Sequence, residues 1–426
     1  MSFNLFETRN NQLLPALCKP FPDELLSSWM ARMAYQHGLT TKEMCAYIWP
    51  SYSGNPDIDR IVGDANLNIL AEKTNCTFAE VNATTMAFYK HVLFAQKNLL
   101  YAPEQWIIPS KRIGSKSGYM QHSSGLMFCP KCLESEPYFK KQWRLAISFA
   151  CTKCGYYLIE SCPHCHKGNS FIDVRQPNFA HQSVYEHMVY CHHCGKDVTD
   201  CEPEIAPVRV VKTQQLLFEI MEHGLNEKVI YTESYFKVLH HMASLLLIDK
   251  QTDRNIKKLA EYVYWENNLS HSDLRPYNDT IVLRDLPVKK RAVVIMLAHW
   301  VLQDWPHRFI DLCLTHKVKK SSLLSDFPNA PYWFWEAVRH GLEPSFPAKL
   351  DNLKHDNTDT CTVRMKEPCL KRLDYDYDEY FYDDNKYEDD DSDCINPDNI
   401  ERIQRLYGID DTRRLRYLFN REECWN

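Results

Sequence analysis

Apolar side chains recur at helical spacing soon after the start of the chain, behind an extended leader that ends at Pro22. The spacing predicts a helix with Asp23 as its N-cap and Gly38 as the residue that stops it. The apolar positions on its face are Leu26, Trp29, Met30 and Met33. Two further helices are predicted over 41–49 and 67–74.

A turn at Asn75-Cys76 separates the 67–74 helix from a capping box, Thr77-Phe78-Ala79-Glu80, which predicts the start of another helix. Helix, short turn and capped helix are the outline of a helix-turn-helix, whose second helix reads DNA. A plain helical hairpin fits the same pattern, so both interpretations stay open. The side chains expected to point outward and to contact DNA or a partner are Asn82, Thr85 and Lys90.

Helical periodicity returns in the second half of the chain. It predicts helices over 214–222, 235–248, 256–265, 289–303 and 332–340. We therefore expect an N-terminal helical domain, like a helix-turn-helix, over 1–110 and a C-terminal helical domain over 208–349. Beyond an acidic stretch, residues 396–426 are expected to form basic helices.

Four C-x2-C pairs lie between these helical parts, within residues 125–207. Two such pairs can direct four thiolates at one metal ion, and four cysteines are the donor set of a structural zinc site. The spacing predicts two Zn²⁺ ions per chain and a fold class that is mainly α with two small, β-containing zinc ribbons. The eight expected ligands are Cys129, Cys132, Cys151, Cys154, Cys162, Cys165, Cys191 and Cys194.

Two pairing schemes are open for these cysteines. In the sequential scheme the first two pairs share one metal ion and the last two share another; in a cross-brace the first and third pairs share one. The spacing favours the sequential scheme. Cys201 is close enough to be a spare ligand, and nearby histidines are expected to face solvent or to donate hydrogen bonds. These histidines are His164, His166, His192 and His193.

Charge is distributed unevenly along the chain. The net charge is −6, but residues 374–393 hold eleven acidic residues against one lysine, so the rest of the chain carries +4. The acidic stretch, 350–395, is expected to be disordered. A mildly basic remainder permits contact with phosphates without requiring it. Seventeen cysteines, and no signal peptide or membrane-spanning run, predict a cytoplasmic protein without a membrane partner.

The motifs of several enzyme classes are missing from the sequence. It has no G-x-x-x-x-G-K-[ST] phosphate loop, no H-E-x-x-H and no H-x-E beside a cysteine pair. A zinc site closed by four protein ligands leaves no position for substrate. We therefore expect no catalytic residues, no cofactor other than zinc and no enzymatic activity.

Two stretches resemble the TniQ family. The first is Pro20-Phe21-Pro22-Asp23-Glu24-Leu25-Leu26-Ser27-Ser28-Trp29-Met30-Ala31-Arg32. The second is the order of parts in the zinc region, where Trp143 precedes a C-x2-C and Tyr157-Leu158-Ile159 precedes Cys162-Pro163-His164-Cys165. The similarity covers about residues 20–200. One departure is Cys154, where the family usually has histidine, and the long acidic stretch has no match.

The resemblance implies a non-enzymatic adaptor that selects the target site in bacterial DNA transposition. Its expected partners are an AAA+ transposition regulator and a target-recognition element, either DNA itself or an RNA-guided CRISPR complex. Family members often form dimers, so a homodimer is also an expectation. The alternative is a zinc-dependent DNA-binding regulator or defence component outside transposition, and a nuclease accessory subunit is a third interpretation.

Overall fold

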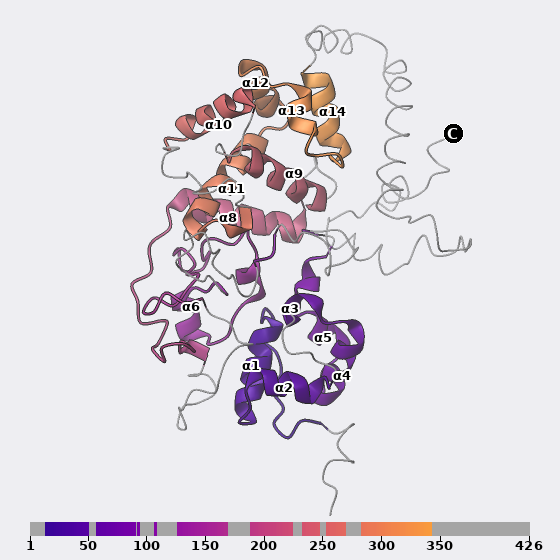
Figure 1. Ribbon diagram of the computed structural model, residues 1–426, viewed down its shortest axis with the longest axis vertical. Coiled ribbons are helices and arrows are strands. Elements are labelled where there is room, and N and C mark those ends of the chain that lie inside the picture. Colours follow the sequence, from indigo (N-terminus) through magenta and orange to yellow (C-terminus); the bar gives the residue numbers. More distant parts are fainter. Residues whose placement is uncertain are drawn as a thin grey trace, which may run out of the picture. The chain divides into compact units, whose positions relative to one another are not determined.

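A computed structural model describes residues 13–50, 57–90, 92–93, 106–108, 126–168, 188–224, 232–247, 253–269 and 283–342. Contacts between residues divide the chain into two compact units (Figure 1). Unit 1 is Met1–Gln215 with Ser272–Leu297, and unit 2 is Leu216–His271 with Ala298–Asn426. Within the described ranges, extended segments meet only as isolated antiparallel bridges, so the mainly helical class is confirmed.

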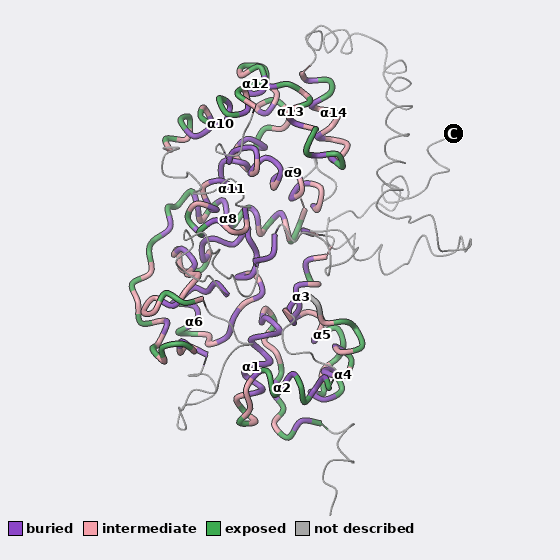
Figure 2. The backbone as a smooth tube through the Cα atoms, viewed as in Figure 1, coloured by how far each residue is buried: buried purple, intermediate pink, exposed green. Residues whose placement is uncertain are grey.

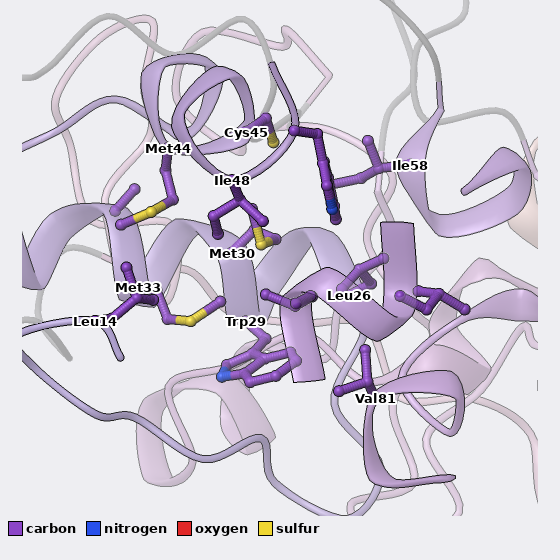
Figure 3. Close-up of a cluster of buried hydrophobic side chains, with 14 of the residues drawn as sticks. Leu14, Leu26, Trp29, Met30, Met33, Met44, Cys45, Ile48, Ile58 and Val81 are labelled. Carbon is purple, nitrogen blue, oxygen red and sulfur yellow. The ribbon is translucent and has the colours of Figure 1, made fainter. Parts of the chain in front are cut away.

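Five helices form the N-terminal part of unit 1: α1 (Leu26–Gln36), α2 (Thr41–Ile48), α3 (Ile58–Ile61), α4 (Asp64–Thr74) and α5 (Phe78–Asn82). Helix α1 packs against α2, and α4 packs against α5. The predicted apolar face of α1 is fully buried and forms the centre of the core (Figure 3). Trp29 lies at this centre, and its indole N–H donates to the Cys18 carbonyl at 2.7 Å.

The ends of these helices follow the sequence signals only in part. Gly38 has a φ of +68° just after α1, as expected of a residue that stops a helix. The capping box is also confirmed, because the Thr77 hydroxyl accepts from the Glu80 N–H. The predicted N-cap of α1 is wrong: Leu25 occupies that position, and the Asp23 carboxylate accepts a hydrogen bond from the Tyr138 hydroxyl instead.

The remainder of unit 1 contains α6 (Pro130–Ser135) and short extended segments around the cysteine pairs. Phe128 exchanges two backbone hydrogen bonds with Ile159, at 3.0 and 2.9 Å. Further along, Tyr157 N–H donates to Glu204 O, and Ala206 N–H donates to Gly155 O, both at 2.9 Å. Helices α8 (Val208–His223) and α11 (Val288–Leu302) each run from one unit into the other.

Unit 2 contains α9 (Thr232–Leu245), α10 (Arg254–Glu266), α12 (His307–Thr315), α13 (Lys320–Leu324) and α14 (Tyr332–Gly341). Aromatic rings fill its centre: Phe334 packs against Phe309 at 5.4 Å between ring centroids, and Phe327 stacks on His241 at 4.2 Å. The five helices predicted for the second half of the chain are confirmed as α8, α9, α10, α11 and α14. Helices α12 and α13 were not predicted.

Several expectations fall outside the described residues, namely the acidic stretch 350–395 and the basic helices over 396–426. Among the helices that are described, none combines the length and the apolar character needed to cross a bilayer.

Candidate metal centres and the charged core beside them

Three of the four C-x2-C pairs form the same tight turn. The residue after each pair has positive φ: 76° at Gly155, 58° at His166 and 71° at Gly195. The N–H of that residue donates to the carbonyl of the cysteine four positions before it, at 2.8 to 2.9 Å. The left-handed conformation suits glycine, which explains two of the three residues. The turn brings both sulfurs of a pair to the same side of the backbone.

The first pair is built differently, on a helix. Cys129 is the N-cap of α6, Pro130 occupies the first helical position, and Leu133 N–H donates to Cys129 O at 2.9 Å. Proline has no N–H to satisfy at that position and its φ already suits a helix. Cys129 and Cys132 therefore present their sulfurs from the first turn of α6.

The eight cysteines come together in two groups of four. Cys129, Cys132, Cys151 and Cys154 form quartet 1, and Cys162, Cys165, Cys191 and Cys194 form quartet 2. Within each quartet all sulfurs lie within 4.8 Å of one another. The groups follow chain order, so the sequential pairing is confirmed and the cross-brace is wrong.

Distances between sulfurs match the edge of a metal-centred tetrahedron. Cys132 Sγ lies 3.5 Å from the sulfurs of Cys151 and Cys154, and the sulfurs of Cys162 and Cys194 are 3.7 Å apart. A tetrahedron with Zn–S bonds of about 2.3 Å has edges of about 3.8 Å. Both quartets therefore have the donor set and the spacing to hold a metal ion.

The two quartets differ in exposure. In quartet 1 three cysteines are buried and Cys154 is half-buried, whereas in quartet 2 Cys194 is exposed and Cys165 is half-buried. Hydrogen bonds with Cys129 and Cys151 raise the pKa of the Cys132 thiol. Four thiolates so close together repel one another, and a divalent cation removes that repulsion. Because the cysteines of quartet 1 are more buried than those of quartet 2, a metal ion in quartet 1 would be more shielded from solvent.

Neighbouring residues do not complete either quartet. The Cys201 thiol points at the Val198 carbonyl at 3.6 Å and belongs to neither group, so the idea of a spare ligand is wrong. His164 Nε2 donates to the Asp197 carbonyl at 2.7 Å, as expected for a histidine that supports the site without binding the metal. His193 N–H donates to Cys191 Sγ at 3.4 Å.

A buried ion pair joins two residues of the opening motif, the stretch 20–32. Arg32 is 2 % exposed and donates to both carboxylate oxygens of Glu24, at 2.8 and 2.5 Å. The Phe21 ring lies 4.4 Å from the Arg32 guanidinium and also stacks on Tyr138. The leader is therefore held against α1 and against the segment that follows quartet 1's first pair.

A second buried cluster joins that segment to α3. Arg144 is 1 % exposed and donates to Asp57 and Asp59, each at 2.5 Å, and to the Ile108 carbonyl. Asp59 also accepts from the Ser27 N–H at 2.7 Å. Burial raises the pKa of Asp59 to about 6, against the opposing effect of Arg144. These charges were not singled out in the sequence, because residues far apart in the chain meet here.

The three residues predicted to contact DNA or a partner do not form one exposed face on α5. Helix α5 ends at Asn82, because the Thr84 and Thr85 hydroxyls donate to the Val81 and Asn82 carbonyls. Thr85 is 3 % exposed, so the expectation that its side chain points outward is wrong. Asn82 and Lys90 are half-buried, and Lys90 lies beyond the helix. Helix α5 itself carries no lysine or arginine.

Residues 15–158 match the family model described as TniQ. This part of the chain is a TniQ domain. The domain contains α1 to α6, both buried charge clusters and quartet 1, and it ends four residues before the first cysteine of quartet 2. No curated protein matches the chain.

Proposed function

We propose that the protein is a non-enzymatic adaptor that selects target sites in DNA transposition. The TniQ match carries the proposal, because this family is associated with target selection. In this role the chain links a target-recognition element, DNA or an RNA-guided complex, to an AAA+ transposition regulator. The two quartets hold structural zinc ions, because four thiolates leave no open coordination position for a substrate.

The exposed surface of α5 favours contact with protein over direct reading of DNA. Its exposed residues are Phe78, Ala79 and Glu80, and Glu80 pairs with Lys19 at 3.5 Å. A helix that reads duplex DNA is flanked by cations that contact phosphates. Phe88, which follows α5, is 52 % exposed beneath the Lys141 ammonium. Exposed aromatic residues are enriched where proteins bind one another.

A reconstituted transposition reaction tests this function. The reaction would combine the transposase and AAA+ ATPase of the element that carries this gene with a marked target, and insertion sites would be mapped. We expect insertions at the target only when the chain is present, and fewer of them with Phe78→Ala and Phe88→Ala together. Lys42→Ala, an exposed change on α2, is the matched control and leaves targeting intact. Target-specific insertion without the chain refutes the adaptor role.

A duplex-binding titration separates the two forms of target recognition. If α5 does not read DNA, duplex affinity is weak and Asn82→Ala leaves sequence preference unchanged. Tight, sequence-selective binding that Asn82→Ala abolishes would show direct reading instead. Purified protein should neither hydrolyse ATP nor cut DNA strands.

A further inference from the structure

Helix α10 in unit 2 has a line of cationic and aromatic side chains along its solvent side. Arg254, Lys258, Tyr262 and Trp265 are spaced four, four and three residues apart, which places them on one face of the helix. Figure 2 shows exposed residues along α10, and Trp265 is 70 % exposed. The opposite face is buried against unit 2 through residues such as Leu259 and Val263.

The connection between α12 and α13 extends this surface. The His316 ring lies 5.0 Å from the Tyr262 ring, and Asn255 Nδ2 donates to the Lys317 carbonyl at 2.8 Å. Lys317 is exposed. We call the combined surface the α10 face; it consists of Arg254, Lys258, Tyr262, Trp265, His316 and Lys317.

The cations of the α10 face outnumber its acids, although the exposed Glu261 lies on the same side of the helix, three positions from Lys258. Across the described ranges, Arg254, Lys258 and Lys317 form no ion pair. Asp253 is occupied by the α10 N-cap and by the Ser322 hydroxyl, and Glu266 interacts with the Tyr262 hydroxyl. Burial and then repulsion from Lys258 lower the pKa of His316. The face therefore has more cations than acids, with Arg254, Lys258 and Lys317 against Glu261, and this surplus of positive charge attracts polyanions.

We propose that the α10 face binds an unpaired nucleic-acid strand, with phosphates at Arg254, Lys258 and Lys317 and bases stacked on Tyr262 and Trp265. The two rings lie 5.7 Å apart at one end of the cationic line. Proteins bind single strands with this combination of a basic track and aromatic platforms. A duplex keeps its base faces inside the stack, and an acidic peptide would use the cations without requiring an exposed indole.

The inference deepens the proposed function and rests on it for the source of the strand. DNA opened at the target and RNA from a guide complex share the same phosphates and base faces, so the chemistry of the α10 face suits both. The surface lies outside the TniQ match, and it adds a nucleic-acid contact that the short α5 helix lacks.

Binding of the full chain to three probes tests the proposal. The probes are an oligothymidine and an oligouridine of about 20 nucleotides, longer than one binding face needs, and a duplex of the same length. We expect both single strands to bind more tightly than the duplex. The double variant Arg254→Ala/Lys258→Ala should weaken single-strand binding at least tenfold and reduce the slope of log K against log salt by about 1.4, because two phosphate contacts are lost.

Trp265→Ala tests the stacking platform separately. The indole is mostly exposed, so its removal should leave the fold intact, while single-strand affinity falls roughly tenfold with an unchanged salt slope. Lys212→Ala, an exposed change on α8, is the charge control and should alter neither quantity. A preference for oligouridine over oligothymidine would assign the face to RNA, and the reverse to DNA.

Two results would overturn the assignment. One is unchanged affinity and salt slope in both α10 variants. The other is equal binding of duplex and single strand together with no effect of Trp265→Ala. A synthetic peptide of residues 374–393 is added as a competitor; if it binds through Arg254 and Lys258 while the oligonucleotides do not, the occupant is an acidic protein segment. If the wild-type chain binds neither single strand while insertion still depends on the chain, this inference is refuted and the proposed function stands.

Discussion

Buried ion pairs join distant segments of the TniQ domain in unit 1. Arg144 and Arg32 are both almost completely buried, and each is matched by carboxylates at hydrogen-bonding distance. Removing one partner of such a pair leaves an uncompensated charge in a region that water does not reach. The sequence could not show these pairs, because Arg144 and Asp57 are 87 positions apart and nothing local marks either residue as buried.

Arg144→Met should therefore weaken the TniQ domain strongly. We expect a loss of about 3–5 kcal/mol, since the fully buried Asp59 would remain without its cation, whereas Asp57 is half-buried and keeps its ion pair with Arg60. Hydrogen–deuterium exchange of α1 and α3 measures the effect locally. Lys153→Met is the matched control: its ion pair with Glu136 is exposed and screened by solvent, so its loss should leave the exchange of α1 and α3 unchanged. Equal exchange in the two variants would contradict the role given to Arg144.

Two buried histidines should make unit 2 sensitive to acid. Burial lowers the pKa of His241 and of His299 to about 4, although the hydrogen bond that His241 donates to the Leu323 carbonyl opposes the shift at His241. The unfolded chain takes up protons below about pH 6.5, whereas the folded chain does so only near pH 4. The stability that depends on neutral rings is complete above pH 6.5 and is lost as the pH falls from 6.5 to 4.

The size of this effect for His241 is on the order of 3 kcal/mol once the pH is below 4. Urea denaturation of wild type and His241→Gln across this pH range measures it. We expect the stability advantage of wild type to shrink as the pH falls; acid loss of zinc affects both proteins and cancels in the difference. A constant difference between them would show that folding does not lower the pKa of His241.

At the scale of elements, long amphipathic helices and the C-x2-C turns were predictable because their signals are local. The apolar positions of α1 are buried as their spacing predicts, and the capping box at Thr77 begins α5. The length of α5 was not predictable from periodicity, because threonine hydroxyls bond back to the carbonyls that would continue the helix. Asp23 failed as an N-cap because its carboxylate is used by Tyr138, a residue from another segment.

The unequal exposure of the quartets predicts two rates of metal release. Native protein should contain two zinc ions, and a chelator should remove the ion of quartet 2 first, because Cys194 is exposed whereas most of quartet 1 is buried. Cys194→Ser should reduce the zinc content to one while the TniQ domain stays folded. Cys132→Ser should give insoluble protein. Release of both ions in a single phase would contradict this order.

Cys154 offers a matched test of ligand chemistry. It is the half-buried member of quartet 1, so a larger side chain can reach the metal from the solvent side. Cys154→His should keep two zinc ions, because imidazole is also a tetrahedral zinc ligand. Cobalt substitution reports the change as a shift from four-sulfur to three-sulfur absorption. Loss of one metal ion in this variant would show that quartet 1 accepts only thiolates.

For the whole molecule, charge is partitioned between one short stretch and the rest. Residues 374–393 carry a net charge of −10 and the remainder carries +4, so the net charge of −6 for the whole chain comes from this one stretch. Deleting 374–393 should leave the solubility and the unfolding transition unchanged and should raise the affinity for oligonucleotides, because long-range repulsion of phosphates is removed. Binding titrations at low and high salt test this; a variant that fails to fold would show that the stretch belongs to a packed core.

The hydrogen bonds of Gly155 and Tyr157 with residues 204–206 have a consequence for how such proteins diversify. These hydrogen bonds join the two ends of the segment that contains quartet 2. Both ends therefore lie next to Cys154 of quartet 1. Lengthening a loop with anchored ends costs little entropy. Changes in the length of the segment that carries quartet 2 should therefore cost little stability. Related proteins can vary this segment while the TniQ domain that precedes it keeps its packing.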